Sequence, residues 1–597
     1  MSQQQNNEMQ KYFYRASAAD FKRIQGIPVA YWVSDKIRAC FYSGAKFIGD
    51  IEKARQGMAT CDNARFLRLW HEVDLWKIKF DAEDLFQTQN LTYKWYPHNK
   101  GGDRRWFGNQ EYVVNWSNNG AELRAYVDEL NKIRPGGRLK NQEYYLKPAA
   151  SWSDISTTGI SARYIPAGFM FDTTGPSIFE ATVYSPEFYV SILNSSVVGY
   201  LSTILNPTLH FTPNDVNNIP LPKKNIELIT NKAKELIFHS KNDWDSSEVS
   251  WGFKGFPIIG RKGSSLKSLY ASFKCELDDN VHYVAKMERE NNVLVRDSYE
   301  LSDEEQIPVD IKTTTLRCDF KYRYGLEFDE KELEGKFYTD TTRELISYIV
   351  GCMMGRYSLD REGLVYAHAG NDGFKALVEE GAYSTFAADD DGILPLTSEN
   401  WFEDDVAARI EGFVATVWGK AQLEENLNFI ADSLCLYAVK PVKKGCETAR
   451  ETIRRYLSTQ FFKDHLKTYK KRPIYWLFSS GKEKAFECLV YLHRYNEATL
   501  PRMRTEYVTP LLGQMAGRIE RLRLQQAEAG TAEAKRIGKD IDSLTKQLTE
   551  LRAFDDQLKH HADMRITLDL DDGVKVNYGK FGTLLSDVKA ITGDKGE

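Results

Sequence analysis

The most restrictive feature of the 597-residue sequence is a heptad pattern of apolar residues between residues 513 and 562. Six of these residues recur at alternating spacings of four and three, with one step skipped: Ile537, Ile541, Leu544, Leu548, Leu551 and Leu558. Such spacing places the side chains on one face of a helix, as in the seam of a coiled coil. Gly530 interrupts the pattern, and Ile519 and Leu522 precede it. We therefore expect a C-terminal antiparallel helical hairpin.

The segment from residue 81 to 222 has a different pattern. Short β-type runs at 111–115 and 168–172 alternate with turn clusters rich in glycine and proline. This alternation predicts a compact, strand-rich domain over 81–222. Because most of the remaining sequence has helical spacing, the expected fold class is α+β, with the strand-rich domain flanked by largely helical domains.

Four further segments complete the predicted organisation. Residues 1–80 are expected to form a helical connector, since apolar residues from Phe66 to Trp76 recur at roughly helical spacing. The others are a helical spacer at 223–300, an acidic mixed domain at 301–440 and a basic helical domain at 441–597 that contains the hairpin. Alternating apolar residues from 566 to 576 predict a terminal β-hairpin.

Charge is distributed unevenly along a chain whose net charge is only −5. Residues 371–411 hold eleven Asp and Glu against Lys375 and Arg409, a net charge of −9. The acidic string 389–392 lacks the alternating ligands of a calcium loop, so we interpret it as a surface turn. Residues 440–472 hold eleven Lys and Arg against three acids, a net charge of +8. A nearly neutral protein can therefore carry a strongly positive face.

Standard catalytic motifs are absent from the sequence. It has no phosphate-binding glycine loop, no nucleophile elbow and no zinc-protease motif. The Asn/Asp-Pro-Pro-Tyr/Phe loop and the glycine-rich cofactor loop of adenine methyltransferases are also missing. The eight cysteines lack the spacing of a zinc site, so we predict no metal site and no catalytic residue. The polar N-terminus is not a signal peptide, and no apolar stretch is long enough to span a bilayer; a cytoplasmic protein without a membrane partner is expected.

Two basic segments within 81–222 are candidates for DNA binding. Arg and Lys neutralise phosphates, Asn can pair with adenine, and aromatic rings can stack on bases. The first segment, 94–109, surrounds a Gly-Gly turn, and the second, 132–147, carries five cations against one acid. The predicted DNA-binding residues are Lys100, Arg104, Arg105, Trp106, Asn109, Arg138, Lys140, Asn141 and Tyr144. The alternatives stay open: a hairpin whose aromatic residues pack the core, and a solvated loop.

The basic stretch 440–472 is a third candidate. Its apolar residues form a stripe on one helix face, which leaves the cations on the others. We predict that Lys463, Lys467 and Lys470 grip phosphates without sequence preference. The alternative is that the cations of this stretch pair with the acidic segment 371–411.

Several longer strings resemble one protein family. Trp152–Ser156, Ser161–Asp172, Leu193–Ser195 and Ile219–Pro222 resemble the target-recognition domain of adenine DNA methyltransferases with type IIG and type I specificity architecture. The resemblance extends, through strings at 31–36, 351–360, 423–431, 471–482 and 491–495, to the C-terminal half of PglX, the adenine-specific methyltransferase family of BREX phage-defence systems. Trp152 and Arg163 therefore join the predicted DNA-binding residues. The catalytic and cofactor residues of the family have no matching positions here.

The resemblance implies sequence-specific recognition of double-stranded DNA for N6-adenine methylation, which marks host DNA and discriminates phage DNA. In such enzymes the target adenine leaves the base stack and receives a methyl group from S-adenosylmethionine. That cofactor would bind a methyltransferase domain or chain, so this chain is expected to hold no cofactor and to be inactive alone. Further implied partners are other BREX proteins and phage-encoded DNA mimics. A non-catalytic protein-interaction scaffold of the defence complex is the alternative.

Overall fold

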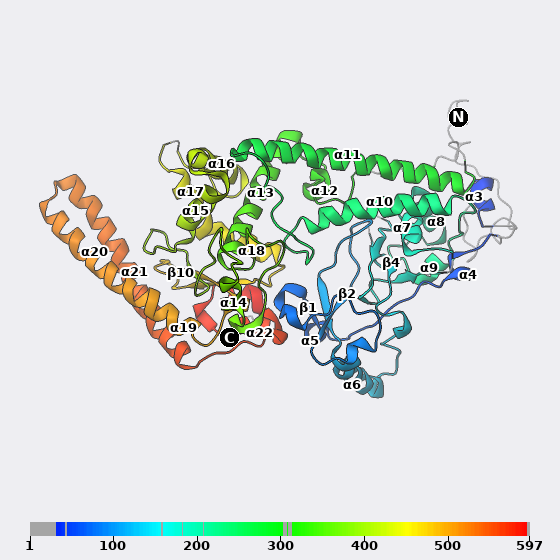
Figure 1. The fold of residues 1–597 in the computed structure, drawn as a ribbon, viewed down its shortest axis with the longest axis horizontal. Helices are drawn as coiled ribbons and strands as arrows, with labels where there is room; N and C mark the ends of the chain where they lie inside the picture. Colours follow the sequence, from blue (N-terminus) through cyan, green and yellow to red (C-terminus); the bar gives the residue numbers. More distant parts are fainter. Residues whose placement is uncertain are drawn as a thin grey trace, which may run out of the picture. The chain divides into compact units, whose positions relative to one another are not determined.

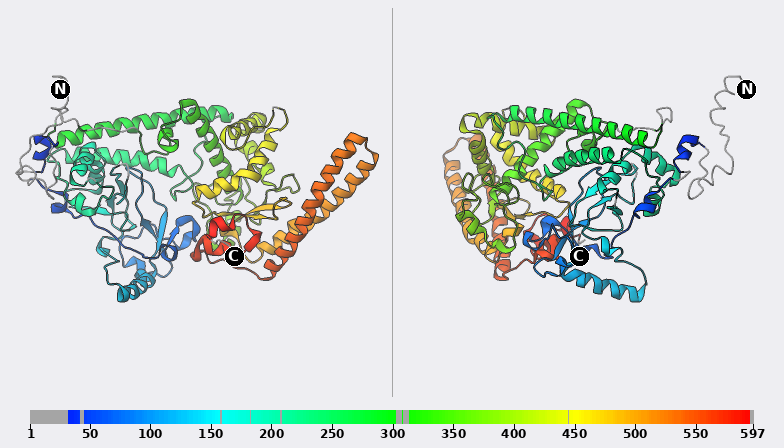
Figure 2. Two further views of the ribbon diagram at one scale, coloured as in Figure 1. Left: turned by 180° about the vertical axis from the view of Figure 1, so that it is seen from behind. Right: turned by 45° about the vertical axis from the view of Figure 1, so that its right-hand side comes forward.

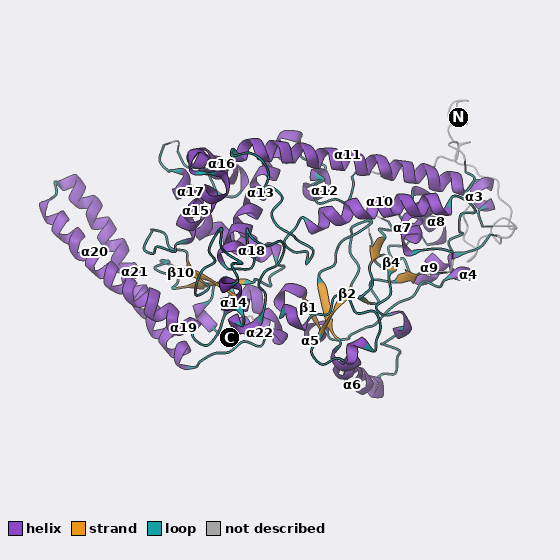
Figure 3. Cartoon of the chain, in the orientation of Figure 1, coloured by secondary structure: helices purple, strands orange, loops and turns teal. Residues whose placement is uncertain are grey.

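The computed structural model describes most of the chain, in residues 32–41, 45–156, 159–181, 183–206, 208–301, 307, 313–443 and 445–593. Small sheets lie among many helices (Figures 1 and 3), which confirms the α+β fold class. Much of the predicted connector 1–80, including Tyr31 of the family-like strings, lies outside the described residues.

The described residues fall into two compact units. The first unit comprises those of Met1–Leu67, Lys77–Trp244 and Glu276–Gly325, and the second comprises those of Arg68–Trp76, Asp245–Cys275 and Leu326–Glu597. The five domain segments expected from the sequence stay predictions.

Two small sheets form the strand-rich part of the first unit. In one, β2 (Trp95–Asn99) pairs antiparallel with β3 (Tyr112–Asn115) and parallel with β6 (Met170–Phe171). In the other, β4 (Ala149–Ser151) lies between β5 (Arg163–Ile165) and β7 (Ser177–Phe179), and both pairings are antiparallel. Every residue of β2, β4 and β7 is buried, so both sheets are interior. The helix α6 (Ser117–Ile133) follows β3 directly.

The family-like Leu-Asn-Ser string joins two helices of the first unit, α7 (Pro186–Leu193) and α8 (Ser196–Leu205). The Ser195 hydroxyl caps α8 by accepting a hydrogen bond from the backbone N–H of Val198. The Asn194 side chain accepts from the backbone N–H of Ala162 and donates to its carbonyl, each at 2.8 Å. One amide therefore ties this helical corner to the segment that leads into β5.

Two long helices follow, α10 (Ile226–Asp245) and α11 (Leu266–Ser298). The irregular segment between them contains several glycines and Pro257, which interrupt the helical spacer expected over 223–300. In the first unit, α11 packs on α7 and α8 through two asparagines. Ser191 donates to Asn291 at 2.6 Å, and the backbone N–H of Ser196 donates to Asn292 at 2.7 Å.

The second unit is largely helical around one small sheet. Its helices include α13 (Glu330–Met353), α14 (Phe374–Glu379), α15 (Val406–Trp418), α16 (Leu423–Tyr437), α17 (Ala449–Tyr456) and α18 (Phe462–Thr468). In the sheet, β10 (Glu487–Tyr491) lies between β8 (Ile393–Pro395) and β9 (Tyr475–Ser479), antiparallel to both. The apolar register pairs Leu489 with Leu394 and Leu477.

The C-terminal helical hairpin is confirmed. Helices α20 (Thr509–Glu528) and α21 (Thr531–Asp563) lie side by side in Figures 1 and 2, and Gly530 is the N-cap of the second. Five of the six predicted seam residues are buried, and Ile541 is half-buried. The heptad spacing therefore identified the contact face of α21.

The helix predicted over Phe66–Trp76 is wrong. The helix α5 (Asn63–Phe66) ends where the strand β1 (Leu67–Leu69) begins, and short 3-10 turns follow. Within the second unit the Trp70 indole N–H donates to the carbonyl of Val249 at 2.8 Å. Long-range contacts such as this one override the helical spacing, because a short isolated helix is marginal by itself.

The predicted terminal β-hairpin is also wrong, because its second strand is the helix α22 (Gly573–Gly579). Val574 and Tyr578 are both buried, and their spacing of four suits one helix face as well as a strand. The Asn577 amide donates to the carbonyls of Asp569 and Gly573 and holds the turn that starts this helix.

No single described helix is long and apolar enough to cross a membrane, although α7 and α8, as a bent pair, have the length and composition to do so.

Truncating Leu551 to Ala should destabilise the hairpin by about 2–5 kcal/mol, since its fully buried side chain would leave a cavity. Hydrogen exchange of residues 509–563 measures this local stability. Leu524, which is 71% exposed on α20, is the matched control. Its change to Ala should stay within about 0.5 kcal/mol, and equal effects of the two changes would contradict the assigned seam.

Candidate nucleic-acid interface

Arg104, a predicted DNA-binding residue, is buried in the first unit. Its guanidinium donates to Asp243 of α10 at 2.7 Å, and it is 4% exposed. The same carboxylate accepts the backbone N–H groups of Arg317, at 2.6 Å, and Cys318, at 3.0 Å. Asp243 therefore joins three segments that are distant in sequence.

The next two residues, Arg105 and Trp106, bind one carboxylate of α11. Arg105 forms a two-pronged ion pair with Glu288, with two N–O distances of 3.0 Å. The Trp106 indole N–H donates to the same carboxylate at 2.6 Å. Trp106 and Glu288 are buried, and the Arg105 side chain is 20% exposed. These bonds fix the basic segment to the helix instead of leaving its charges free.

The two residues added by the family resemblance are interior as well. Arg163 is fully buried and donates to the carbonyl of Gly102 at 2.8 Å, which anchors the Gly-Gly turn on β5. Burial lowers the pKa of Arg163 to about 10, and the nearby Asp103 charge opposes that change. The fully buried Trp152 donates from its indole N–H to the carbonyl of Phe211 at 2.8 Å.

These positions correct the expectation that the side chains of Arg104, Trp106, Trp152 and Arg163 face DNA, because in this structure all four lie inside the fold. Trp106 and Trp152 pack in the core, which is the alternative that the sequence left open for the aromatic residues. Two other residues of the first segment are half-buried: Lys100, whose ammonium is 3.9 Å from Asp172, and Asn109, which accepts from the backbone N–H of Arg104.

The second segment, 132–147, keeps cations at the surface, and we call it the basic loop. Its cations are Lys132, Arg134, Arg138, Lys140 and Lys147; four are exposed and Arg138 is half-buried. Lys132 pairs with Glu129, and Arg138 donates to the carbonyl of Arg134 at 3.0 Å.

Two further residues position the basic loop. Asn141 adopts a left-handed backbone conformation (φ 51°), and its amide donates to the carbonyl of Gln56 at 2.8 Å. Arg55 lies 4.1 Å over the Tyr144 ring and donates to its hydroxyl, and Lys147 lies near the same ring. Since the Asn141 amide is engaged within the fold, it is less suited to pairing with adenine, whereas the exposed Lys140 can reach a ligand.

The basic stretch of the second unit divides into two groups. Its arginines form internal ion pairs: Arg450 with Glu411 and Glu424, Arg454 with Asp405, and Arg455 with Glu447. For Arg450 and Arg454, the alternative of pairing with the acidic segment is therefore the one observed. Lys463, Lys467 and Lys470 are exposed.

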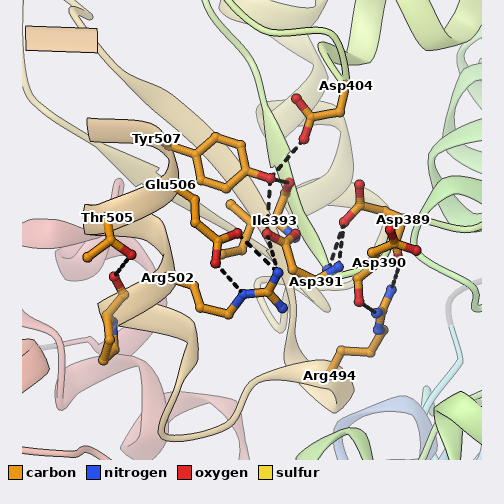
Figure 4. A network of polar contacts seen from close by, with 12 residues as sticks. Asp389, Asp390, Asp391, Ile393, Asp404, Arg494, Arg502, Thr505, Glu506 and Tyr507 are labelled. Atoms are coloured by element: carbon orange, nitrogen blue, oxygen red, sulfur yellow. Dashed lines mark hydrogen bonds and ion pairs between the residues drawn. The ribbon is translucent and has the colours of Figure 1, made fainter. Parts of the chain in front are cut away.

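The acidic string 389–392 is not the surface turn that we expected. Figure 4 shows it in a polar network with Arg494 and Tyr507. Arg494 donates to the carbonyls of Asp389 and Asp390, and Asp389 itself is 7% exposed. The Tyr507 hydroxyl contacts Asp391 at 3.0 Å and Asp404 at 2.8 Å. Burial, and then the neighbouring Asp391, raise the pKa of Asp389.

Nothing in this network indicates a cation site: the described residues contain no group of His, Cys, Asp and Glu that could hold a metal ion. Local sequence offered no sign of the partners of this string, because Arg494 lies 105 residues from Asp389.

We expect Arg104→Met to destabilise the first unit by about 3–5 kcal/mol, because it would leave Asp243 buried without its ion-pair partner. Thermal unfolding and hydrogen exchange of α10 measure the effect. Arg138→Met is the control; it removes a half-buried cation with local bonds and should cost less than about 1 kcal/mol. A fully stable Arg104 variant would show that this ion pair does not hold the unit together.

The contribution of Asp389 to the stability of the second unit should fall as pH rises from about 4, the ordinary pKa of Asp. A raised pKa in the folded state means that Asp389 keeps a proton that the unfolded chain releases. A folded-state pKa that is higher by one lowers the free energy of unfolding by about 1.4 kcal/mol at high pH. Unfolding midpoints between pH 4 and 8 should therefore decline less in Asp389→Asn than in the parent. The exposed neighbour is the control: Asp390→Asn should leave the pH curve unchanged.

Comparison with known proteins places the sequence beside methyltransferases. No family model matches the chain. It is 50% identical over 593 residues to the adenine-specific methyltransferase BrxX of Escherichia coli O9:H4 (strain HS), and 36% identical over 595 residues to the adenine-specific methyltransferase PglX of Lacticaseibacillus casei (strain Zhang). The chain spans about half the length of these relatives, 46% of each. Over 97% of its own length, the chain is thus homologous to two proteins named as adenine-specific methyltransferases.

Proposed function

We propose that this chain is the sequence-specific DNA-recognition part of a BREX-type N6-adenine DNA methyltransferase that marks host DNA and discriminates phage DNA. The observation that carries the proposal is the 50% identity to BrxX over 593 residues. The exposed cations of the basic loop and of Lys463, Lys467 and Lys470 support it, since DNA affinity depends on cations that can reach phosphates.

The two exposed cation groups suit different tasks. The basic loop belongs to the same unit as the strand-rich domain, and its polar groups are held in place by Gln56 and Arg55. A positioned loop of this kind can read base edges in the major groove. The lysines at 463, 467 and 470 lie within and just after α18, and their long, exposed side chains suit phosphate contacts. S-adenosylmethionine and the methyl transfer belong, in this proposal, to a methyltransferase domain or chain.

The second candidate is a non-catalytic protein-interaction scaffold of the BREX defence complex. The helical hairpin favours it, because α20 and α21 bury their seam against each other and leave long polar faces exposed. Ionic strength distinguishes the two functions, since each phosphate contact adds a slope of about −0.9 to the dependence of log affinity on log salt.

Changing Lys463, Lys467 and Lys470 together to Gln should make that slope shallower by about 0.9 for each phosphate contact that the change removes, whatever the DNA sequence. DNA binding measured over a salt series tests this. The matched control changes three exposed lysines of α21, Lys535, Lys539 and Lys546, to Gln. An unaltered slope in the first variant would indicate that the basic loop, and not these three lysines, binds the phosphates. If the parent protein does not bind DNA, the scaffold function is favoured.

Lys140→Gln should weaken binding to the recognised duplex by about 1–3 kcal/mol and relax specificity at one base pair. The recognised site is obtained by selection from a random duplex pool, and binding to selected and random duplexes is then compared. The control is Lys132→Gln, which changes an exposed cation already paired with Glu129. An equal loss of affinity on both duplexes would show that Lys140 contacts phosphate only.

A further inference from the structure

The second unit exposes a tryptophan, Trp76, at the end of its segment Arg68–Trp76. Trp76 is 58% exposed, and of the tryptophans that the structure describes only Trp32 is exposed as well. An indole face is large, flat and electrostatically negative, so it attracts cations as well as apolar groups. No part of the proposed DNA-recognition function uses this side chain.

The indole of Trp76 is held in one orientation from one side. Its ring stacks on His368, with 3.7 Å between the centroids and 22° between the planes. The buried Asp74 fixes both residues, because its carboxylate accepts the backbone N–H of Trp76 at 2.9 Å and lies 3.4 Å from Nδ1 of His368. Since His368 covers one face of the indole, the opposite face is the one open to a ligand.

Two glycines follow His368 in the turn beside the indole. Gly370 and Gly373 adopt the left-handed backbone conformation, with φ of 73° and 74°. A Cβ on Gly373 would lie 3.7 Å from the Trp76 ring, and a Cβ on Gly370 would meet no atom within 4 Å. Neither glycine carries a side chain that could cover the indole, so this turn presents backbone beside an open aromatic face.

Two exposed carboxylates belong to the same surface. Asp372 directly precedes Gly373, the glycine that approaches the indole. Asp390 is brought to the turn by Arg494, which donates to the side-chain oxygen of Asn371 and to the carbonyl of Asp390, each at 2.8 Å; Figure 4 shows the second of these bonds. The side chains of Asp372 and Asp390 are exposed, and neither has a partner among the described residues.

The nearby cations are engaged elsewhere. Arg494 is buried and donates to Asn371 and to two backbone carbonyls. Lys375 of α14 lies 3.8 Å from Glu379 of the same helix. The carboxylates of Asp372 and Asp390 therefore leave an excess of negative charge beside the open indole face.

We propose that Trp76, Asp372 and Asp390, which we call the Trp76 surface, form a docking site for an arginine-bearing segment of a protein partner. A guanidinium is planar, stacks on an indole face and donates hydrogen bonds to carboxylates, so it matches both parts of this surface. The same carboxylates repel phosphate, which makes a nucleic acid a poorer fit. The proposal is independent of the DNA-recognition function proposed above.

The probe is the peptide Gly-Arg-Gly-Arg-Gly, and the matched peptide carries citrulline in place of both arginines. Citrulline keeps the planar group and lacks the charge. The full chain is labelled with fluorotryptophan, and the fluorine NMR signal of Trp76 is assigned by its absence in Trp76→Phe. The arginine peptide should shift this signal and leave that of Trp32 in place, whereas the citrulline peptide should shift neither.

Two variants test the two parts of the surface, with affinity measured by fluorescence anisotropy of the dye-labelled arginine peptide. Trp76→Leu should weaken binding by about fivefold, since it removes the aromatic face. Changing Asp372 and Asp390 together to Asn should also weaken it by about fivefold, and that loss should shrink at high salt. Trp32→Leu is the matched control, because it removes the other exposed tryptophan and should leave the affinity unchanged. The carboxylate variant changes only exposed side chains, so it carries the test even if Trp76→Leu lowers the unfolding midpoint.

The proposal is overturned if neither peptide shifts the Trp76 signal, or if the arginine and citrulline peptides bind equally. Equal losses of affinity in Trp76→Leu and Trp32→Leu would also contradict it. A single-stranded oligonucleotide tests the other class of ligand. If the oligonucleotide shifts the Trp76 signal and the arginine peptide does not, the indole stacks on a nucleobase and the assigned partner is wrong.

Discussion

The first unit depends on two buried carboxylates, Asp243 of α10 and Glu288 of α11. Together they neutralise Arg104 and Arg105 and accept the Trp106 indole N–H. Each carboxylate residue is at most 7% exposed, so each pair is screened little by water. If either partner were missing, the other would be left as a buried charge, which is far more costly than the absence of a surface ion pair. The segment from Arg104 to Trp106 is therefore held to both helices at once.

This arrangement explains why the strand-rich domain keeps its shape with so little sheet. Its strands are short, from two to five residues, and its two sheets are small. Hydrogen bonds from polar side chains connect its segments instead. Arg163 anchors the Gly-Gly turn, and Asn194 links the turn between α7 and α8 to the segment before β5. In the same unit, the Gln56 carbonyl and Arg55 hold the basic loop, which positions its exposed cations for the DNA recognition proposed above.

The second unit handles its buried charges differently. Arg494 is satisfied by backbone carbonyls, and Arg450, Arg454 and Arg455 by carboxylates. Arg356 instead donates to the hydroxyls of Tyr357 and Tyr491, with the buried Glu248 nearby. These arginines act mainly as internal bridges, whereas the exposed cations proposed to bind DNA are mostly lysines. That division suits the chemistry, because arginine forms forked bonds in fixed geometry and lysine is a flexible point charge.

The sequence alone determined the features that depend on local spacing. The heptad pattern predicted the α20–α21 hairpin and its buried face, and β-type runs predicted β3 and β6, because the periods of helix and strand are properties of neighbouring residues. Only the tertiary structure decided the roles of the cations. Arg104 and Lys140 look equally suited to DNA in the sequence, yet one meets a carboxylate 139 residues away and the other stays exposed. The helix expected at Phe66–Trp76 failed because distant contacts, which no local pattern encodes, chose between conformations of similar intrinsic stability. The terminal β-hairpin failed because a spacing of four between apolar residues suits a helix face as well as a strand, so the local pattern was ambiguous.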